Sequence, residues 1–286
     1  MDKKHISIIV IIFSIFWALY SDELNNTYSV PVYGELEVYF LDVGQADSIL
    51  ITCNNESMLI DAGNNEDGKL LVDYFNKLKI SNFKYLVGTH PHEDHIGGLD
   101  DIIYNFNIDN IYIPDVITTT KTFTDVLSAM DNKKLEYNVP KIGDKFLLGD
   151  AVIQVLYTGT DSNDLNNTSI VLRLDFGEVS FLFTGDATDK TEAILLNKNI
   201  DVDILKVGHH GSKYSSSDKF LNNVSPEYAI ISVGNPNTYG HPHNETINKL
   251  NNRNIKMYRT DKDDSIIVNT DGKNINITNL DTNTDG

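Results

Sequence analysis

The sequence predicts one mixed α/β domain that begins near Glu35 and fills most of the 286-residue chain. Short apolar strands alternate with segments of helical spacing, and no linker rich in Pro or Gly interrupts them after Gly34. The composition, 41% hydrophobic and 22% charged, is that of an ordinary globular protein and excludes a disordered, collagenous or coiled-coil chain. A domain of this size can bury a sizeable core.

The first expected elements are strands, and strands mixed with helices follow. Early strands are expected over residues 36–41, 47–51 and 57–60, followed by a helix over 69–78 and a short strand over 85–87. The later expected elements are strands within 146–184 broken by a polar turn at 161–167, strands over 202–207 and 228–233, and helices from 190 and over 244–251.

Both ends of the chain are expected to lie outside this domain. Lys3 and Lys4 precede the uncharged apolar run 6–20, which is short for a membrane span and typical of a secretory signal. We expect the protein to be extracytoplasmic, either secreted or anchored to the cell membrane by this segment. The expected parts are a signal peptide or anchor at 1–22, a linker at 23–34, the domain at 35–280 and a polar tail at 281–286.

Charge and cysteine content restrict the function. The chain has 41 acidic and 23 basic residues, a net charge of −18, so no broad nucleic-acid-binding surface is expected. Cys53 is the single cysteine, which excludes an internal disulfide and a cysteine-based zinc site.

The most informative segment directly follows the strand expected at 85–87. Within six residues it carries four groups able to bind a metal, namely His90, His92, Asp94 and His95. Imidazole and carboxylate suit Zn²⁺ or Mn²⁺, and neighbouring ligands on one tight loop can serve two metals. A chance cluster of surface histidines is the alternative, but three of the eight histidines in the chain lie here.

Two further strand ends carry the same residue types. Asp186 ends an apolar strand, although it could instead cap the helix expected from Lys190. The strand over 202–207 leads to His209 and His210, for which a buried structural pair is the alternative. Three strand ends that carry His and Asp together predict a dinuclear metal site.

The order of these motifs resembles the metallo-β-lactamase superfamily and, within it, the C-terminal domain of ComEC-type competence proteins. The matching segments are 40–48, 59–63, 89–98, 167–172, 184–186, 206–212, 231–235 and 239–242. The resemblance extends from about residue 35 to about residue 277. The multi-pass channel of ComEC proteins has no counterpart in this sequence, so we expect a free-standing relative of their hydrolase domain.

The resemblance implies an αββα four-layer sandwich, in which two mixed sheets are flanked by helices and the metals lie at one edge. It implies His90, His92 and a bridging Asp186 on the first of two divalent ions, Zn²⁺ or Mn²⁺. The ligands implied for the second ion are Asp94, His95, Asp186 and one of the pair His209 and His210. We expect His210 to be the ligand and His209 to contact phosphate or donate a proton.

One supporting residue and one departure accompany this ligand set. Asp61 is implied to support the site by accepting a hydrogen bond from a ligand imidazole. The wider superfamily has another histidine some tens of residues after the metal loop, but none lies between His95 and His209. Residues 167–169 stand where that ligand is expected. We therefore expect the first metal to have three protein ligands, which leaves double occupancy open and argues against a β-lactam hydrolase.

The function expected is that of a metal-dependent phosphodiesterase or nuclease, in which a metal-activated hydroxide attacks a phosphodiester. Asp94 and Asp186 are expected to lower the net charge at the metals and orient the nucleophile, and His209 to protonate the leaving oxygen. The residues expected near the substrate are Ser212, Lys213, Asn235 and His241, the last two of which are also explained as turn and loop residues. The substrate would be single-stranded DNA if the role is competence, that is, DNA uptake.

Two alternatives remain at this point. The first is an extracellular phosphoesterase that acts on a small or cell-wall phosphodiester, such as a phosphocholine, teichoic-acid or nucleotide substrate. The second is a non-catalytic metal-binding accessory protein, which would not need so complete a ligand set.

Overall fold

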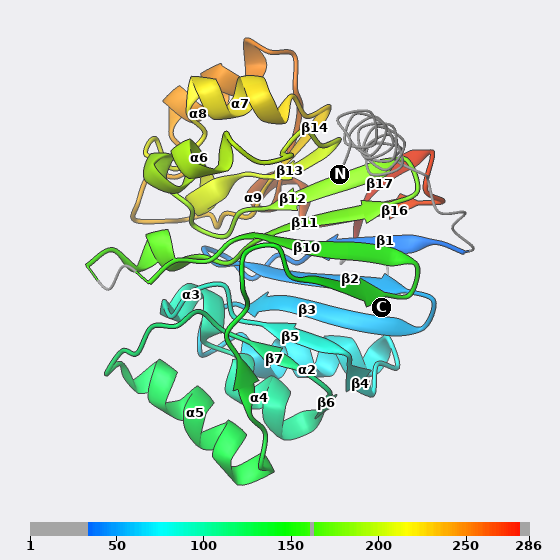
Figure 1. The fold of residues 1–286 in the computed structure, drawn as a ribbon, viewed down its shortest axis with the longest axis vertical. Helices are drawn as coiled ribbons and strands as arrows, with labels where there is room; N and C mark the ends of the chain where they lie inside the picture. The colour runs from blue at the N-terminus through cyan, green and yellow to red at the C-terminus, as the bar shows by residue number, and fades with distance from the viewer. Residues whose placement is uncertain (1–33, 161–162, 281–286) are drawn as a thin grey trace, which may run out of the picture. The chain divides into compact units, whose positions relative to one another are not determined.

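Two mixed β-sheets pack face to face in the computed structural model of the protein, which describes residues 34–160 and 163–280 (Figure 1). These residues belong to one unit of the chain, Val32–Gly286. Helices cover the outer face of each sheet, so the unit has four layers in the order helix, sheet, sheet, helix. The predicted αββα sandwich is therefore confirmed.

The first sheet has eight strands and combines antiparallel and parallel pairing. In spatial order its strands are β17 (Ile275–Leu280), β16 (Ser265–Thr270), β1 (Leu36–Phe40), β2 (Ser48–Cys53), β3 (Glu56–Ala62), β5 (Tyr85–Val87), β7 (Ile111–Tyr112) and β8 (Tyr137–Asn138). β1 pairs antiparallel with β16 and β2, whereas β5 runs parallel to β3 and β7. A separate two-stranded sheet pairs β4 (Asn82–Phe83) with β6 (Asn107–Ile108).

The second sheet has seven strands and also combines antiparallel and parallel pairing. In spatial order they are β15 (Lys256–Arg259), β14 (Tyr228–Ile231), β13 (Ile204–Lys206), β12 (Val179–Phe183), β11 (Val171–Phe176), β10 (Ala151–Tyr157) and β9 (Lys145–Leu148). β9 to β12 pair antiparallel, and β12 to β15 run parallel.

Successive side chains along each strand point to opposite faces of its sheet, and the apolar ones form three separate cores. Phe40 of β1 and Phe183 of β12 meet between the sheets, with their ring centroids 6.2 Å apart. Tyr39 of β1 and Leu182 of β12 point the other way, toward the helical layers. The two sheets therefore share one apolar interface, and each sheet has a second one under its own helices.

The helices group by sheet. α2 (Gly68–Lys77), α4 (Leu99–Asn105) and α5 (Lys121–Lys133) pack on the first sheet, and α6 (Asp189–Leu195), α7 (Asp218–Val224) and α8 (Asn244–Asn251) pack on the second. The short helical turns are α3 (Glu93–Ile96), α9 (Thr260–Asp263), η1 (Leu165–Thr168) and η2 (Gly208–Gly211). α3 follows β5 and η2 follows β13, so these two turns each come directly after a parallel strand.

Several of the predicted parts lie outside the described residues. These are the leader at 1–22, the tail at 281–286 and all but the last residue of the linker at 23–34. Within the part of the chain that is described, no helix has the length and apolar character needed to cross a bilayer.

Candidate metal centre

The loop after β5 brings the histidines of the metal motif together. His90 and His95 are both completely buried, and their ring centroids lie 4.1 Å apart. His92 precedes the first turn of α3 and is half-buried, with its Nδ1 3.0 Å from His90 Nε2. The tight turn of α3 therefore presents three imidazoles from one short segment to the same space.

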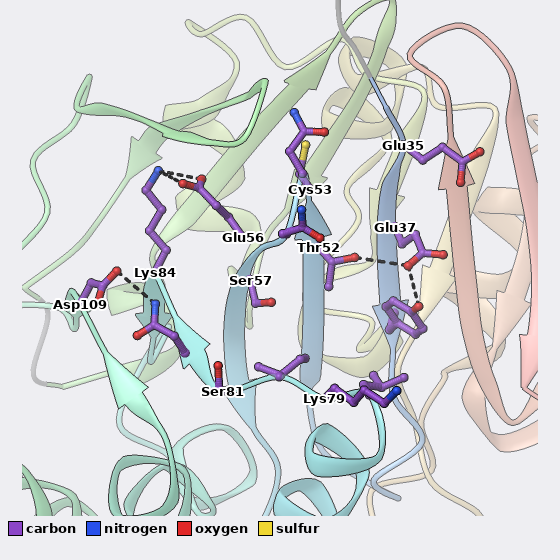
Figure 2. Close-up of a pocket in the computed structure, with 16 residues that line it drawn as sticks. Glu35, Glu37, Thr52, Cys53, Glu56, Ser57, Lys79, Ser81, Lys84 and Asp109 are labelled. Atoms are coloured by element: carbon purple, nitrogen blue, oxygen red, sulfur yellow. Dashed lines mark hydrogen bonds and ion pairs between the residues drawn. The ribbon is translucent and has the colours of Figure 1, made fainter.

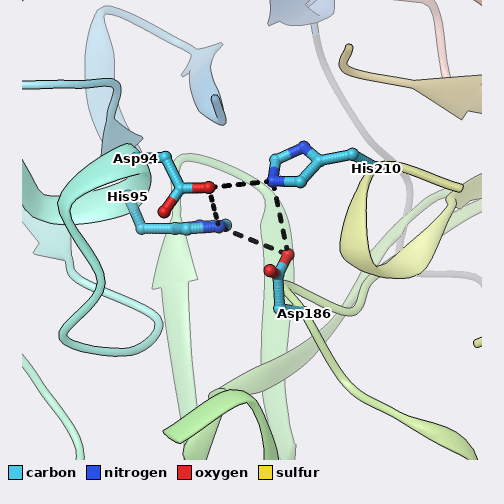
Figure 3. Close-up of side chains that lie close together, drawn as sticks. All are labelled: Asp94, His95, Asp186 and His210. Atoms are coloured by element: carbon cyan, nitrogen blue, oxygen red, sulfur yellow. Dashed lines mark ion pairs between the residues drawn. The ribbon is translucent and has the colours of Figure 1, made fainter. Parts of the chain in front are cut away.

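Asp186 and His210 enter this space from the second sheet (Figure 3). One oxygen of Asp186, Oδ1, lies 3.3 Å from His95 Nε2 and 3.8 Å from His210 Nε2. Oδ2 of Asp94 lies 3.3 Å from His210 Nε2 and 3.9 Å from His95 Nε2. Each of the four residues thus offers one ligand atom, and these atoms all lie within 4.8 Å of one another.

Unpaired atoms in this cluster fit a metal ion. Nε2 of His95, Oδ1 of Asp186 and Nε2 of His210 are buried and have no hydrogen-bond partner. A buried polar atom without a partner is costly, and a cation would satisfy all three at once. The donor set of two imidazoles and two carboxylates suits Zn²⁺ or Mn²⁺ equally.

The residues expected on the first metal lie next to this cluster. His90 Nε2 is 3.9 Å from Asp186 Oδ2 and hydrogen-bonds with His92. Ser169 stands where the superfamily histidine was expected, with its Oγ 3.5 Å from His90 Nδ1. This hydroxyl also accepts a hydrogen bond from the Asp186 backbone. Ser169 therefore lies on the Nδ1 side of His90, whereas the Nε2 of that ring faces Asp186 and His92.

Asp61 lies directly behind the ligands. Its Oδ2 is 2.7 Å from His95 Nδ1 and accepts a further hydrogen bond from the Thr89 hydroxyl at 2.7 Å. Its Oδ1 accepts from the Thr89 backbone. Because Asp61 accepts a hydrogen bond from the Nδ1–H of His95, the Nε2 of that ring faces the cluster, where it could bind a metal.

The two histidines of the 209–210 pair have different environments. His210 Nδ1 donates to the Ser232 carbonyl at 2.9 Å, which turns its Nε2 toward the cluster. His209 stays at the edge of the cavity, with Nε2 3.7 Å from Asp186 Oδ2. Both residues have a φ of 51°, a left-handed conformation that is uncommon outside glycine. Such strain is typical of functional sites, and here it places two adjacent histidines in different roles.

Burial and neighbouring charges set the protonation of the cluster. Burial disfavours a charged imidazole, but Asp186, Asp61 and Asp94 together raise the pKa of His95 well above its usual value. Burial also opposes the charge of Asp186, but His95 and His210 outweigh it and hold the pKa of that carboxyl well below its usual range. The metal-free cluster is therefore a buried network of opposite charges.

The outer histidines behave differently because burial dominates there. Burial, followed by the effect of His95, lowers the pKa of His90 well below its usual value. Burial also lowers the pKa of His209, and with His209, His210 and His243 it lowers the pKa of His241 to about 4. His90 and His241 are therefore neutral at neutral pH.

A cavity of about 310 Å³ opens onto the cluster. Its lining residues are Gln45, His92, Glu93, Asp94, Asn166, Asp186, His209, His210, Tyr239 and His241. His241, predicted near the substrate, lies here, and its ring is 5.4 Å from that of His209. Asn235, also predicted there, lines an adjoining basin of about 830 Å³ instead.

The other two residues predicted near the substrate do not line either space. Ser212 is buried, and its Oγ accepts from the Tyr214 backbone at 3.3 Å. Lys213 is exposed, and its Nζ lies over the Tyr214 ring, 5.2 Å from the centroid. The left-handed turn at residues 209–211 changes the chain direction just before them, so we leave both out of the proposed site.

Sequence reasoning missed two buried charges beneath the cluster. Lys206 Nζ lies 2.8 Å from Asp47 Oδ2, and both side chains are almost completely buried. The available signal was Lys206 itself, because a lysine inside an apolar strand requires a buried partner. Gln45 and Tyr239, which line both spaces, were also not singled out.

A separate pocket of about 650 Å³ lies at the start of β3, opposite the end that carries Asp61 (Figure 2). Several of its polar groups pair with one another. Glu56 accepts from Lys84, and Glu37 accepts from the hydroxyls of Tyr39 and Thr52. We assign this pocket no part in the site.

Comparison with known proteins identifies the family. The metallo-beta-lactamase superfamily matches over residues 41–235, and the chain belongs to this superfamily. The match starts just before the Gly44–Ser48 turn and ends beyond the His209–His210 pair, so it includes every ligand proposed above.

Within the superfamily, the chain is related to competence proteins, as the sequence motifs indicated. It is 30% identical over 253 residues to ComE operon protein 3 of Bacillus subtilis, which covers 81% of this chain and 33% of that protein. It is 31% identical over 233 residues to Competence protein ComA of Neisseria gonorrhoeae, covering 79% and 31%. The chain thus matches about a third of the length of these curated relatives.

Solved structures show the same fold. The metallo-beta-lactamase fold protein YhfI of Bacillus subtilis superposes with a TM-score of 0.58 at 12% identity, and the match covers 83% of this chain and all of that one.

Proposed function

We propose that the protein is a metal-dependent hydrolase of phosphodiesters. The observation that carries this proposal is the group of three buried ligand atoms on His95, Asp186 and His210 that have no hydrogen-bond partner, at the floor of an open cavity. Two divalent ions bound here would supply an ionised water near neutral pH and neutralise phosphate oxygens. The relation to competence proteins supports phosphodiesters as the substrate class.

The proposed roles of the chain's own residues follow from their positions. Asp94, on the cavity wall, orients the attacking water, while His90 and His92 complete the first metal position with Asp186. His209 lines the cavity, and its Nε2 can pass a proton to the leaving oxygen. Burial lowers the pKa of His209, so the protonated ring is the minor form near neutral pH, but it is a stronger acid than an exposed imidazolium.

Replacing Asp94 tests this proposal. We expect Asp94→Ala to lower turnover of a chromogenic phosphodiester by about 100-fold or more, because it removes a ligand as well as the orienting group. Protein stripped of metal and reloaded with Mn²⁺ or Zn²⁺ would be assayed, with circular dichroism to verify folding. Asp115→Ala, which changes an exposed aspartate outside the cavity, is the matched control.

Either of two results would contradict the proposal. The first is full activity in a folded Asp94→Ala variant. The second is no turnover of any diester by wild-type protein that binds metal, which would support a non-catalytic accessory role instead.

A specific observation favours a small, cation-bearing diester over DNA as the substrate. The 830 Å³ basin shares Gln45, Glu93, Asp94 and Tyr239 with the metal cavity. Its described lining includes seven carboxylates and neither lysine nor arginine; the carboxylates are Asp42, Glu66, Asp67, Glu93, Asp94, Asp261 and Asp264. Arg259 pairs with Asp261 but leaves the others in excess. This charge repels a polyanion and attracts an alkylammonium group.

A direct comparison separates these substrates. Turnover of end-labelled single-stranded DNA would be measured beside that of a glycerophosphocholine-type diester with the same loaded protein. A preference for the ammonium diester that weakens in Asp264→Asn supports the small substrate. Metal-dependent cutting of DNA that is lost in Asp94→Ala, with no turnover of the small diester, supports a nuclease in DNA processing.

We also propose that the protein acts outside the cytoplasm. The apolar run 6–20 after Lys3 and Lys4 supports this, as does the relation to competence proteins. Cell fractionation and the mass of the mature chain test it, and a full-length cytoplasmic protein would contradict it.

A further inference from the structure

The proposed reaction does not use the buried ion pair between Lys206 and Asp47. Lys206 ends β13 with a completely buried side chain, and its Nζ also donates to the Val207 carbonyl at 3.0 Å. Desolvating two charges is costly, and such a pair gives little net stability compared with apolar residues of similar size. Its position beneath the cluster therefore calls for another explanation.

Asp47 contacts the segments that carry ligands on the first sheet. Its backbone N–H donates to the Asp94 carbonyl at 3.0 Å, and its carbonyl accepts from Gly63 N at 2.9 Å. Asp94 belongs to the metal loop, and Gly63 follows the strand that carries Asp61. The backbone of Asp47 therefore links these two segments on one side of the centre.

The side chain of Asp47 reaches the ligand from the second sheet. Its Oδ1 has no hydrogen-bond partner and lies 3.5 Å from His210 Nδ1, while Oδ2 lies beside Lys206. Lys206 precedes the η2 turn that carries His210. The pair thus joins the start of β2 in the first sheet to the end of β13 in the second, directly under His210.

Lys206 also supplies a positive charge beside a second buried group of possible ligands. Asp47, Asp61 and His95 form a second buried group whose ligand atoms lie within 4.8 Å of one another. The Lys206 ammonium already neutralises Asp47 there. Without it, Asp47 would be drawn toward the Nδ1 proton of His210, which now goes to the Ser232 carbonyl.

We propose that Asp47 and Lys206 are positioning residues that hold His210 opposite Asp94 and so set the affinity for the second divalent ion. This inference rests on the metal centre of the proposed function. It predicts that changing either residue weakens metal binding even though neither one is a ligand.

Calorimetric titration of the metal-free full chain with Mn²⁺ tests this inference. Asp47→Asn keeps the size of the side chain and a hydrogen-bond acceptor for Lys206, so it is the main variant, and Lys206→Met is the second. We expect each to weaken binding of the second equivalent by about 10- to 100-fold. The control is Arg173→Met, which removes another buried cation of the same sheet, paired with Asp175 at 2.6 Å. It should lower the melting temperature and leave both equivalents bound.

The outcomes separate positioning from mere stability and from the proposed activity. Folded Asp47→Asn protein that binds both equivalents like the wild type, even if it melts lower, would overturn the inference. Loss of the second equivalent in Asp47→Asn supports the inference. This holds even if the wild-type protein binds two ions but hydrolyses no diester, a result that would contradict only the proposed function. Wild-type protein that binds no metal would overturn both.

Discussion

At the scale of single residues, His95 is held at both ring nitrogens by carboxylates. Its Nδ1 faces Asp61 at 2.7 Å and its Nε2 faces Asp186 at 3.3 Å. These charges and Asp94 raise its pKa well above the usual value in spite of burial. A metal ion requires the neutral imidazole, so it must displace this proton.

This competition predicts that metal binding releases protons. The apparent affinity for Mn²⁺ should rise with pH until the pH exceeds the raised pKa of His95. Below that pKa the imidazole is protonated, and the proton competes with the metal ion. At neutral pH we expect on the order of one proton released per chain, measured by calorimetry in two buffers of different ionisation enthalpy. Asp61→Asn keeps the ligands but lowers the pKa of His95, so it should release fewer. Equal affinity at all pH values would contradict the account.

The raised pKa of His95 also affects the stability of the metal-free protein. Here a higher pH is unfavourable, whereas it favours metal binding. The pKa of His95 is raised in the folded state, so its stabilising contribution in the metal-free protein is fully present below about pH 6.5. That contribution is lost as the pH rises through the folded-state pKa. Raising the pH thus favours metal binding while weakening the metal-free fold.

The metal loop, Asp186 and the 209–210 pair could be found from sequence because each ligand type directly follows an apolar strand. For the Asp47–Lys206 pair, the lysine inside an apolar strand indicated a buried partner, but the sequence could not identify that partner, which lies 159 positions away. The placement of Ser212 and Lys213 was also out of reach, since it depends on the backbone conformation of the preceding turn.

At the scale of elements, most strands and the helix α8 followed from their apolar patterns. The helix expected at 244–251 has the bounds of α8. By contrast, α5 was not predicted, although Thr120 caps it and Phe123, Val126 and Met130 are buried at helical spacing. The hairpin of β16 and β17 was also not singled out, because three of the six side chains of β17 are polar and none of the six is buried.

The α3 turn depends on close approach to the loop after β3. A Cβ at Gly97 would lie 2.2 Å from the Asn64 carbonyl carbon and 2.3 Å from Asn65 N, both backbone atoms that cannot move freely. Gly97 N–H also donates to the Gly63 carbonyl at 2.9 Å. Only glycine therefore lets the metal loop seat against the Asp61 strand.

Enlarging this residue should disturb both stability and metal binding. We expect Gly97→Ala to lower the free energy of unfolding by about 1–3 kcal/mol through overpacking, and to weaken Mn²⁺ binding by displacing His95. Denaturant unfolding and calorimetry would measure the two effects. Gly143→Ala is the control, because Gly143 has open space for a Cβ at a φ of 97°. Gly143→Ala should lower stability but leave metal binding unchanged. Normal metal binding in Gly97→Ala would contradict the prediction.

At the scale of the whole molecule, the cluster joins the two halves of the sandwich. His95 and Asp94 follow β5 of the first sheet, whereas Asp186 and His210 follow β12 and β13 of the second. A bound ion would therefore cross-link the two sheets at one edge. The −18 net charge of the chain adds repulsion that bound cations would partly offset.

Metal loading should consequently stabilise the whole domain. At a free Mn²⁺ concentration 100 times the dissociation constant we expect about 2.7 kcal/mol of added stability, visible as a higher thermal midpoint that a chelator reverses. Asp186→Asn should abolish the increase because Asp186 would contribute to both of the proposed metal positions. A thermal midpoint that does not respond to metal would speak against a cross-linking ion.

The most direct test of the central claim is anomalous diffraction from crystals soaked in Zn²⁺. The account predicts strong peaks among Asp94, His95, Asp186 and His210, with a second peak toward His90 and His92 when both positions are filled. Crystals that show zinc only elsewhere on the acidic surface, with these side chains unchanged, would contradict the metal centre and the hydrolytic function proposed for it.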